Sequence, residues 1–125
     1  MEPSQQLLSL LLDNKELLER GCAAVEPPMC YRHLVGKVLQ GEWMLEPLPG
    51  GVMIWEEQDH GAHREIFVVL VAGRFVLDAA FRKAEEIAKM MGCKYITTLN
   101  VHQSLLRWYQ KRNGRVQGWR MVKEI

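Results

Sequence analysis

The sequence predicts a mixed α+β fold with the element order α-α-β-β-β-α-β-α-β around a central, mostly antiparallel sheet flanked by helices. Apolar residues recur at helical spacing in two long stretches, residues 4–20 and 76–91. A Gly-rich turn at residues 49–51 separates two short β-like runs, which is typical of a hairpin. Six consecutive apolar residues, 66–71, indicate a strand buried on both faces at the centre of a sheet.

The length and the charge favour one globular unit. A chain of 125 residues suits a single domain, and we expect residues 1–125 to form it. The net charge of +1 divides unevenly, with −6 in residues 1–63 and +7 in residues 64–125. The simpler interpretation is attraction between the two halves, and the alternative is a basic face for a phosphate-bearing ligand or nucleic acid.

Cysteine usage and hydropathy indicate an intracellular protein. Cys22, Cys30 and Cys93 form no Cys-x-x-Cys pair. The apolar run at residues 7–12 has acidic flanks and no small-residue cleavage site, so we expect no signal peptide. No apolar run is long enough to cross a bilayer. The sequence therefore predicts a cytoplasmic protein with reduced thiols and no membrane association.

The first half of the chain predicts two helices and a hairpin. The first helix spans about residues 4–20, with Ser4 as the N-cap and Gly21 as the stop. The second begins at Pro28, because proline suits a first helical turn, and ends near Gly41. Strands at 43–48 and 52–55 form the hairpin.

The second half predicts alternating strands and helices. After the central strand, a helix runs from Phe75 or Val76 to Met91, and Gly92 ends it. A strand at 94–99, a helix at 102–112 and a last strand at 116–125 complete the order.

From the hairpin onwards, this order is similar to that of the GNAT (Gcn5-related N-acetyltransferase) superfamily. The hairpin corresponds to 43–55, and the other matched elements are 65–71, 76–91, 94–99 and 102–112. The run Tyr109 to Gly114 resembles the family's "YEKLGF" ending of its short helix, with Asn113 in place of glycine. The family's first strand is not evident. The chain resembles short, diverged GNAT-like proteins encoded by phages.

The resemblance implies an acetyl-CoA site at the turn after the central strand, where the family has R/Q-x-x-G-x-G/A. The cofactor-binding residues would be Val69, Val71, Gly73, Arg74, Phe75, Val76 and Asn100. One glycine stands where two are expected, bulky residues such as Phe75 occupy the space, and Asp78 would repel a pyrophosphate. The turn therefore favours a structural role over CoA binding.

The resemblance also assigns Tyr109 as the general acid, although a tyrosine on an apolar helix face also suits packing. Asn100 would bind a ligand or cap the following helix. Candidates for the general base near the strand ends are Glu56, Glu57, His60 and His63. The spacing His60-x-x-His63 is a weak metal signal without a third ligand at fixed spacing, so we expect no metal site.

Two functions follow. The sequence favours a non-catalytic GNAT-like protein that serves as a binding or assembly module, as in a phage virion. The alternative is an acetyl-CoA-dependent N-acetyltransferase acting on an amine of a small molecule or protein. A protein partner or self-association is favoured over nucleic acid, despite the basic aromatic run 107–115. An enzyme should have an opening between strands 65–71 and 94–99, and an opening plugged by Phe75 or by tryptophan side chains would exclude the enzyme.

Overall fold

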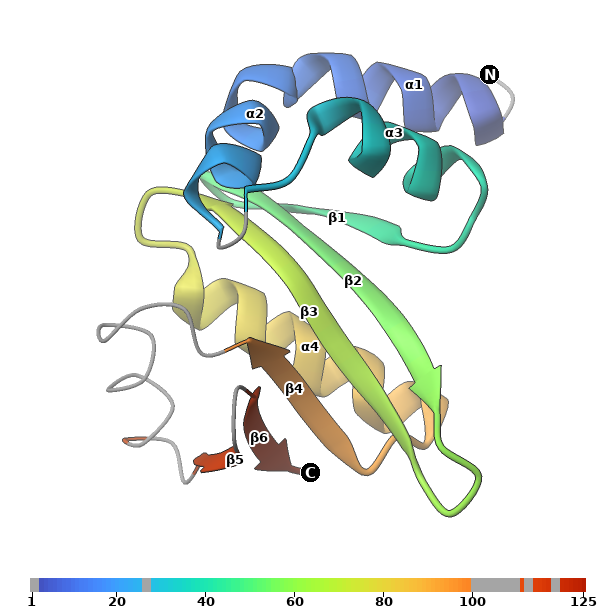
Figure 1. Cartoon of the computed structure of the whole chain (residues 1–125), viewed down its shortest axis with the longest axis vertical. Coiled ribbons are helices and arrows are strands. Elements are labelled where there is room, and N and C mark those ends of the chain that lie inside the picture. The colour runs from blue at the N-terminus through green and yellow to red at the C-terminus, as the bar shows by residue number, and fades with distance from the viewer. Residues whose placement is uncertain (1–2, 26–27, 100–110, 112–113, 118–119) are drawn as a thin grey trace.

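The computed structural model describes residues 3–25, 28–99, 111, 114–117 and 120–125 (Figure 1). Its helices are α1 (Pro3–Asp13), α2 (Lys15–Ala24), α3 (Tyr31–Leu39) and α4 (Leu77–Met91). Its strands are β1 (Met44–Leu48), β2 (Gly51–Asp59), β3 (Arg64–Gly73), β4 (Tyr95–Leu99), β5 (Arg115–Gln117) and β6 (Arg120–Glu124). The predicted mixed α+β class is confirmed.

The strands form one sheet in the order β1-β2-β3-β4-β6-β5. Only β3 and β4 pair in parallel, with α4 as the connection between them, and the other neighbours are antiparallel. The predicted hairpin and central strand are confirmed. The single strand expected at 116–125 is wrong, because β5 and β6 pair with each other and so satisfy backbone groups that one long strand would expose at the sheet edge.

Helices cover both faces of the sheet, and each face has its own apolar core. Figure 1 shows α1, α2 and α3 together at one end of the molecule and α4 alongside β3 and β4. The core against α4 takes from β2 and β3 the residues Met53, Trp55, Ile66 and Val68. The core beneath the three N-terminal helices takes from the same strands Val52, Ile54, Leu70 and Ala72.

A β-bulge at Val69 explains how β3 serves both cores. Ile54 and Trp55 are adjacent in β2, but their partners in β3 are Leu70 and Val68, so Val69 is an extra residue. Side chains alternate along a strand, and one extra residue reverses the alternation. Even-numbered residues of β3 therefore face α4 before the bulge and the N-terminal helices after it.

The expectation of one helix over residues 4–20 is wrong, because the chain breaks at Asn14. The backbone there has φ −107° and ψ 10°, and the Asn14 side chain donates a hydrogen bond to the carbonyl of Leu10 at 2.8 Å. The Leu10 carbonyl also accepts from the Asn14 amide at 3.1 Å, and the next carbonyl, that of Leu11, accepts from the Tyr31 hydroxyl at 3.1 Å, so side-chain hydrogen bonds satisfy backbone groups at the break. Ser4 lies inside α1 rather than at its N-cap, since the helix already begins at Pro3.

Gly21 does not end a helix, contrary to the prediction. It lies within α2, where an added Cβ would come within 2.9 Å of Leu70 Cδ1 and 3.3 Å of Ala72 Cβ. The glycine therefore allows α2 to approach β3 closely. The next helix begins at Tyr31, with Cys30 at the N-cap, and not at Pro28.

The end of α4 follows the prediction. Gly92 has φ 70°, and the amide of Cys93 donates to the carbonyl of Ala88 at 2.8 Å. A left-handed glycine with this hydrogen bond is the Schellman ending of a helix. The helix expected at 102–112 lies, except for helical Lys111, outside the described residues. Among the described helices, none combines the length and the apolar character needed to cross a membrane.

The three cysteines should differ in reactivity. Cys30 is exposed, whereas Cys22 and Cys93 are buried, and burial raises the pKa of both buried thiols above the ordinary value of 9.0. We expect iodoacetamide at neutral pH to modify Cys30 alone in the folded chain and all three thiols in urea, as counted by mass spectrometry. Equal labelling rates for all three in the folded chain would contradict the burial.

The same burial has a consequence for stability at high pH. The unfolded chain releases its thiol protons near the ordinary pKa of 9.0, while the folded chain holds them to higher pH. The contribution of these two buried, protonated thiols to the free energy of unfolding is therefore complete below pH 9.0. It is lost as the pH rises through the raised pKa of each thiol in the folded chain.

Candidate functional site

The strands β3 and β4 form a fork. They pair from Glu65 opposite Tyr95 to Val68 opposite Thr98, and the Thr98 hydroxyl donates to the Val68 carbonyl at 2.8 Å at the last paired position. Beyond this last pair β3 continues to Gly73, whereas β4 ends at Leu99 (Figure 1). The backbone of residues 69–73 therefore has no β4 partner within the described part of the chain.

The bulge lies at the mouth of the fork. Val69 has no partner in β2 and none among the described residues of β4. A bulged residue leaves the ladder, so its backbone groups are available for other hydrogen bonds. Fork and bulge together create a stretch of strand edge that is unpaired among the residues the structure describes.

The turn from β3 to α4 begins at the end of this edge. Phe75 has φ 54°, a left-handed conformation that is uncommon for a bulky residue, and its side chain is 99% exposed. Val76 is buried and stands at the N-cap of α4, where its own apolar side chain makes no capping hydrogen bond. Phe75 therefore does not plug the opening between β3 and β4, because its side chain lies in solvent.

Close packing of two backbone segments requires a glycine at position 73 in this turn. Gly73 has φ 134°, and an added Cβ would lie 2.4 Å from the carbonyl oxygen of Gly50 and 2.8 Å from Gly51 Cα. Gly51 in turn lies against Ala72, where an added Cβ would be 2.1 Å from the carbonyl oxygen. The turn between β1 and β2 and the turn between β3 and α4 are thus in backbone contact that only glycine permits.

An open groove of about 510 Å³ adjoins this contact. It runs between α2 and the end of β3 and is lined by Leu17, Arg20, Gly21, Ala24, Gly50, Val71, Ala72, Gly73 and Arg74. Arg20 pairs with Glu16 at 2.5 Å, whereas Arg74 has no ion pair with any residue that the structure describes. Two guanidinium groups therefore border the groove, and that of Arg74 is available to an anion.

The structure brings most of the predicted cofactor residues together on one continuous segment. Val69 and Val71 lie on the free edge of β3, and residues 73–76 form the turn. Asn100 and Tyr109 lie outside the described residues, so their predicted roles stay predictions.

Two of the four candidate bases are engaged in other hydrogen bonds. Glu56 accepts from Trp43 Nε1 at 3.1 Å and from Gln58 Nε2 at 2.7 Å. Glu57 accepts from Arg64 Nη1 at 3.1 Å in a largely exposed ion pair. Glu56 is half-buried and Glu57 is exposed, and both carboxylates already accept hydrogen bonds from neighbouring side chains.

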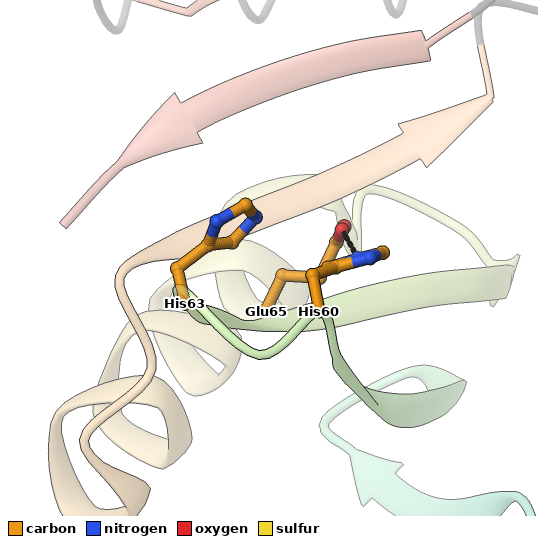
Figure 2. Close-up of side chains that lie close together, drawn as sticks. All are labelled: His60, His63 and Glu65. Atoms are coloured by element: carbon orange, nitrogen blue, oxygen red, sulfur yellow. Dashed lines mark hydrogen bonds and ion pairs between the residues drawn. The ribbon is translucent and has the colours of Figure 1, made fainter.

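The other two candidates lie beside a buried carboxylate that the sequence interpretation missed (Figure 2). Glu65 is 2% exposed; one carboxylate oxygen contacts His60 Nε2, and the other accepts a hydrogen bond from the Thr97 hydroxyl. The His63 ring lies 5.0 Å from the His60 ring and forms a T-shaped contact with the Tyr95 ring. A buried carboxylate with a partly exposed imidazole beside it can exchange protons with solvent through that imidazole.

Solved structures of acetyltransferases resemble this chain. A GNAT-family acetyltransferase from Listeria monocytogenes superposes with a TM-score of 0.60 at 13% identity, covering 98% of this chain and 89% of that one. A Bacillus subtilis acetyltransferase in complex with CoA gives 0.59 at 17% identity, covering 90% and 93%. Tetrahymena Gcn5 gives 0.56 at 16% identity, covering 94% and 88%. No protein-family model and no curated protein sequence matches the chain, so the likeness is one of fold.

Proposed function

We propose, from the premise that the chain has the fold of the GNAT acetyltransferases, that it binds acetyl-CoA in the fork between β3 and β4 and acetylates an amine. The observation that carries the proposal is the free edge of β3 beyond Val68, beside the bulge at Val69. The sequence favoured a non-catalytic module because the turn has one glycine where two are expected, bulky residues such as Phe75, and Asp78. The exposure of Phe75 removes the steric objection that this residue raised.

The residues present fit the parts of acetyl-CoA. Its pantetheine arm carries amide groups, which can pair with the free edge of residues 69–72 as an added strand does. Its pyrophosphate would lie near Arg74 and the first turn of α4, where backbone N–H groups and the helix dipole favour anions. Asp78 in that turn opposes an anion, so we expect moderate affinity.

Acetyl-CoA supplies an activated acetyl group, whose transfer to an amine forms an amide and releases the CoA thiol. An ammonium group must lose a proton before it can attack, and Glu65 is the candidate base for that step. His60, whose side chain is 39% exposed and contacts Glu65, provides the route by which the proton reaches water. Tyr109 remains the proposed acid that returns a proton to the departing thiolate, with Asn100 as a proposed ligand contact.

A thermal-shift titration tests cofactor binding. A ligand that binds only the folded chain raises Tm, and the rise grows with ligand concentration. We expect acetyl-CoA and CoA to raise Tm, and Arg74→Ala to weaken the affinity about tenfold, because a charge-assisted hydrogen bond contributes about 1.5–3 kcal/mol.

The matched control is Arg82→Ala, which removes an exposed arginine from the body of α4 rather than from its N-terminal turn. This variant should bind CoA as the wild type does. No rise in Tm at millimolar acetyl-CoA, or equal weakening in both variants, would count against a cofactor site at the fork.

A second candidate is a non-catalytic module that binds a protein or a second copy of the chain, as in the assembly of a phage particle. The exposed, left-handed Phe75 favours it, because a solvent-exposed aromatic side chain suits a protein interface. A failed CoA titration together with a concentration-dependent molecular mass, abolished by Phe75→Ser, would support this candidate over the enzyme.

A further inference from the structure

The hairpin between β2 and β3 presents two imidazoles and a carboxylate on one side of the sheet. We propose that His60, His63 and Glu65 bind a divalent transition-metal ion, with Zn²⁺ as the best match. One ligand atom from each of the three side chains lies within 4.8 Å of the other two. Figure 2 shows the three side chains on one side of the hairpin, below β4.

The hairpin geometry explains why these residues meet. The amide of His60 donates to the carbonyl of His63 at 2.9 Å, so the two residues face each other across the strands as a closing pair. Residues opposite each other in a hairpin share a face, and so do residues two apart along a strand. Glu65 follows His63 by two residues and therefore lies on the same face. The pattern His-x-x-His-x-Glu thus becomes a cluster only when the chain turns between the two histidines.

The contacts around the cluster orient its ligands. Thr97 donates to Oε2 of Glu65, which leaves Oε1 directed towards His60. The ring of His63 packs edge-on against Tyr95 at 5.0 Å. Hydrogen bonds and packing of this kind hold metal ligands in place and raise their affinity for the ion.

The distances require only small side-chain movements. In a tetrahedral zinc site with bonds of about 2.1 Å, neighbouring ligand atoms lie roughly 3.4 Å apart. The ion would replace the hydrogen bond between His60 and Glu65, and His63 would rotate towards them. Gly61 in the turn has φ 83° and open space around it, so the turn can adjust without a clash.

The ligand set indicates the kind of ion. Two imidazole nitrogens and one carboxylate oxygen suit Zn²⁺, and three protein ligands leave a fourth position for water. The ion also provides a countercharge for a carboxylate that is 2% exposed. Because the ion would occupy the oxygen that faces His60, it would compete with the base role of Glu65 and inhibit acetyl transfer.

Calorimetric titration with ZnCl₂ and absorption spectroscopy with CoCl₂ test the site without any assay of activity. Exposed Cys30 is an alternative zinc ligand, so the titrations use the full chain carrying Cys30→Ser. We expect one ion per chain and the visible bands of tetrahedral Co²⁺ with nitrogen and oxygen ligands.

Single-ligand variants distinguish this site from incidental binding. His60→Gln and His63→Gln should each abolish the Co²⁺ bands, and Thr97→Val should weaken Zn²⁺ binding about 10- to 100-fold, because it releases Glu65. His33→Gln, which removes an exposed histidine packed on Trp43, is the matched control and should bind normally. No binding by the parent chain, or equal binding by His63→Gln and His33→Gln, would overturn the proposal. Either result would leave the CoA titration unaffected.

Discussion

Gly73→Ala should lower the free energy of unfolding by about 3 kcal/mol or more, a large part of the 5–15 kcal/mol typical of a domain. Two effects add. The residue has φ 134°, a conformation that alanine rarely adopts, and the new Cβ would lie 2.4 Å from the Gly50 carbonyl oxygen. Urea denaturation gives the free energy directly, and Tm should fall by roughly 10 °C.

Gly36→Ala is the matched control, because Gly36 lies inside α3 and an added Cβ meets nothing within 4 Å. It should stabilise the chain by about 0.5–1 kcal/mol, since alanine costs less than glycine in a helix. If Gly73→Ala left the urea midpoint unchanged, the backbone contact between the two turns would be disproved.

Glu65→Gln should lower kcat/KM for acetyl transfer by about 10²- to 10⁴-fold, the contribution of a positioned general base. Glutamine preserves the size of the side chain and its capacity to accept a hydrogen bond from Thr97. It cannot take up a proton, so chemistry should be lost while acetyl-CoA affinity stays within about twofold. Release of the CoA thiol, followed with a thiol reagent across a panel of amines, measures the loss.

Glu56→Gln is the control for this variant, because Glu56 is a β2 carboxylate held by Trp43 and Gln58 and was an alternative base candidate. It should retain full activity on any amine that the wild type acetylates. Equal losses in the two variants would remove Glu65 from its role, and a wild type inactive on every amine would refute acetyl transfer itself.

The sequence predicted the sheet and α4 well because their signals are local. A turn at Pro49-Gly50, a β-branched run and Gly92 at a helix end act over a few residues, and the structure confirms each. The N-terminal helices were predicted less well. The break at Asn14 depends on a side-chain hydrogen bond, and the role of Gly21 depends on the approach of β3, which is distant in sequence.

The candidate site was predicted in outline but not in its chemistry. The sequence favoured a structural role for the turn at Gly73, but it could not show that the structural partner is the Gly50 backbone, which is distant in sequence. Glu65 was missed because, in the sequence, it is one polar residue at the start of an apolar strand. Its hydrogen-bond partners are His60, between β2 and β3, and Thr97 on β4. No sequence pattern links Glu65 to both of them.

Because of the bulge at Val69, the alternation of β3 side chains between the two faces of the sheet shifts by one residue. Before it, even positions belong to the α4 layer, and after it, they belong to the layer of N-terminal helices. Substitutions in one of the two cores therefore do not change which residues of β3 face the other core. The number of residues between Val68 and Leu70 is under a tighter constraint than the identity of Val69, since only that length keeps both layers in register with the sheet.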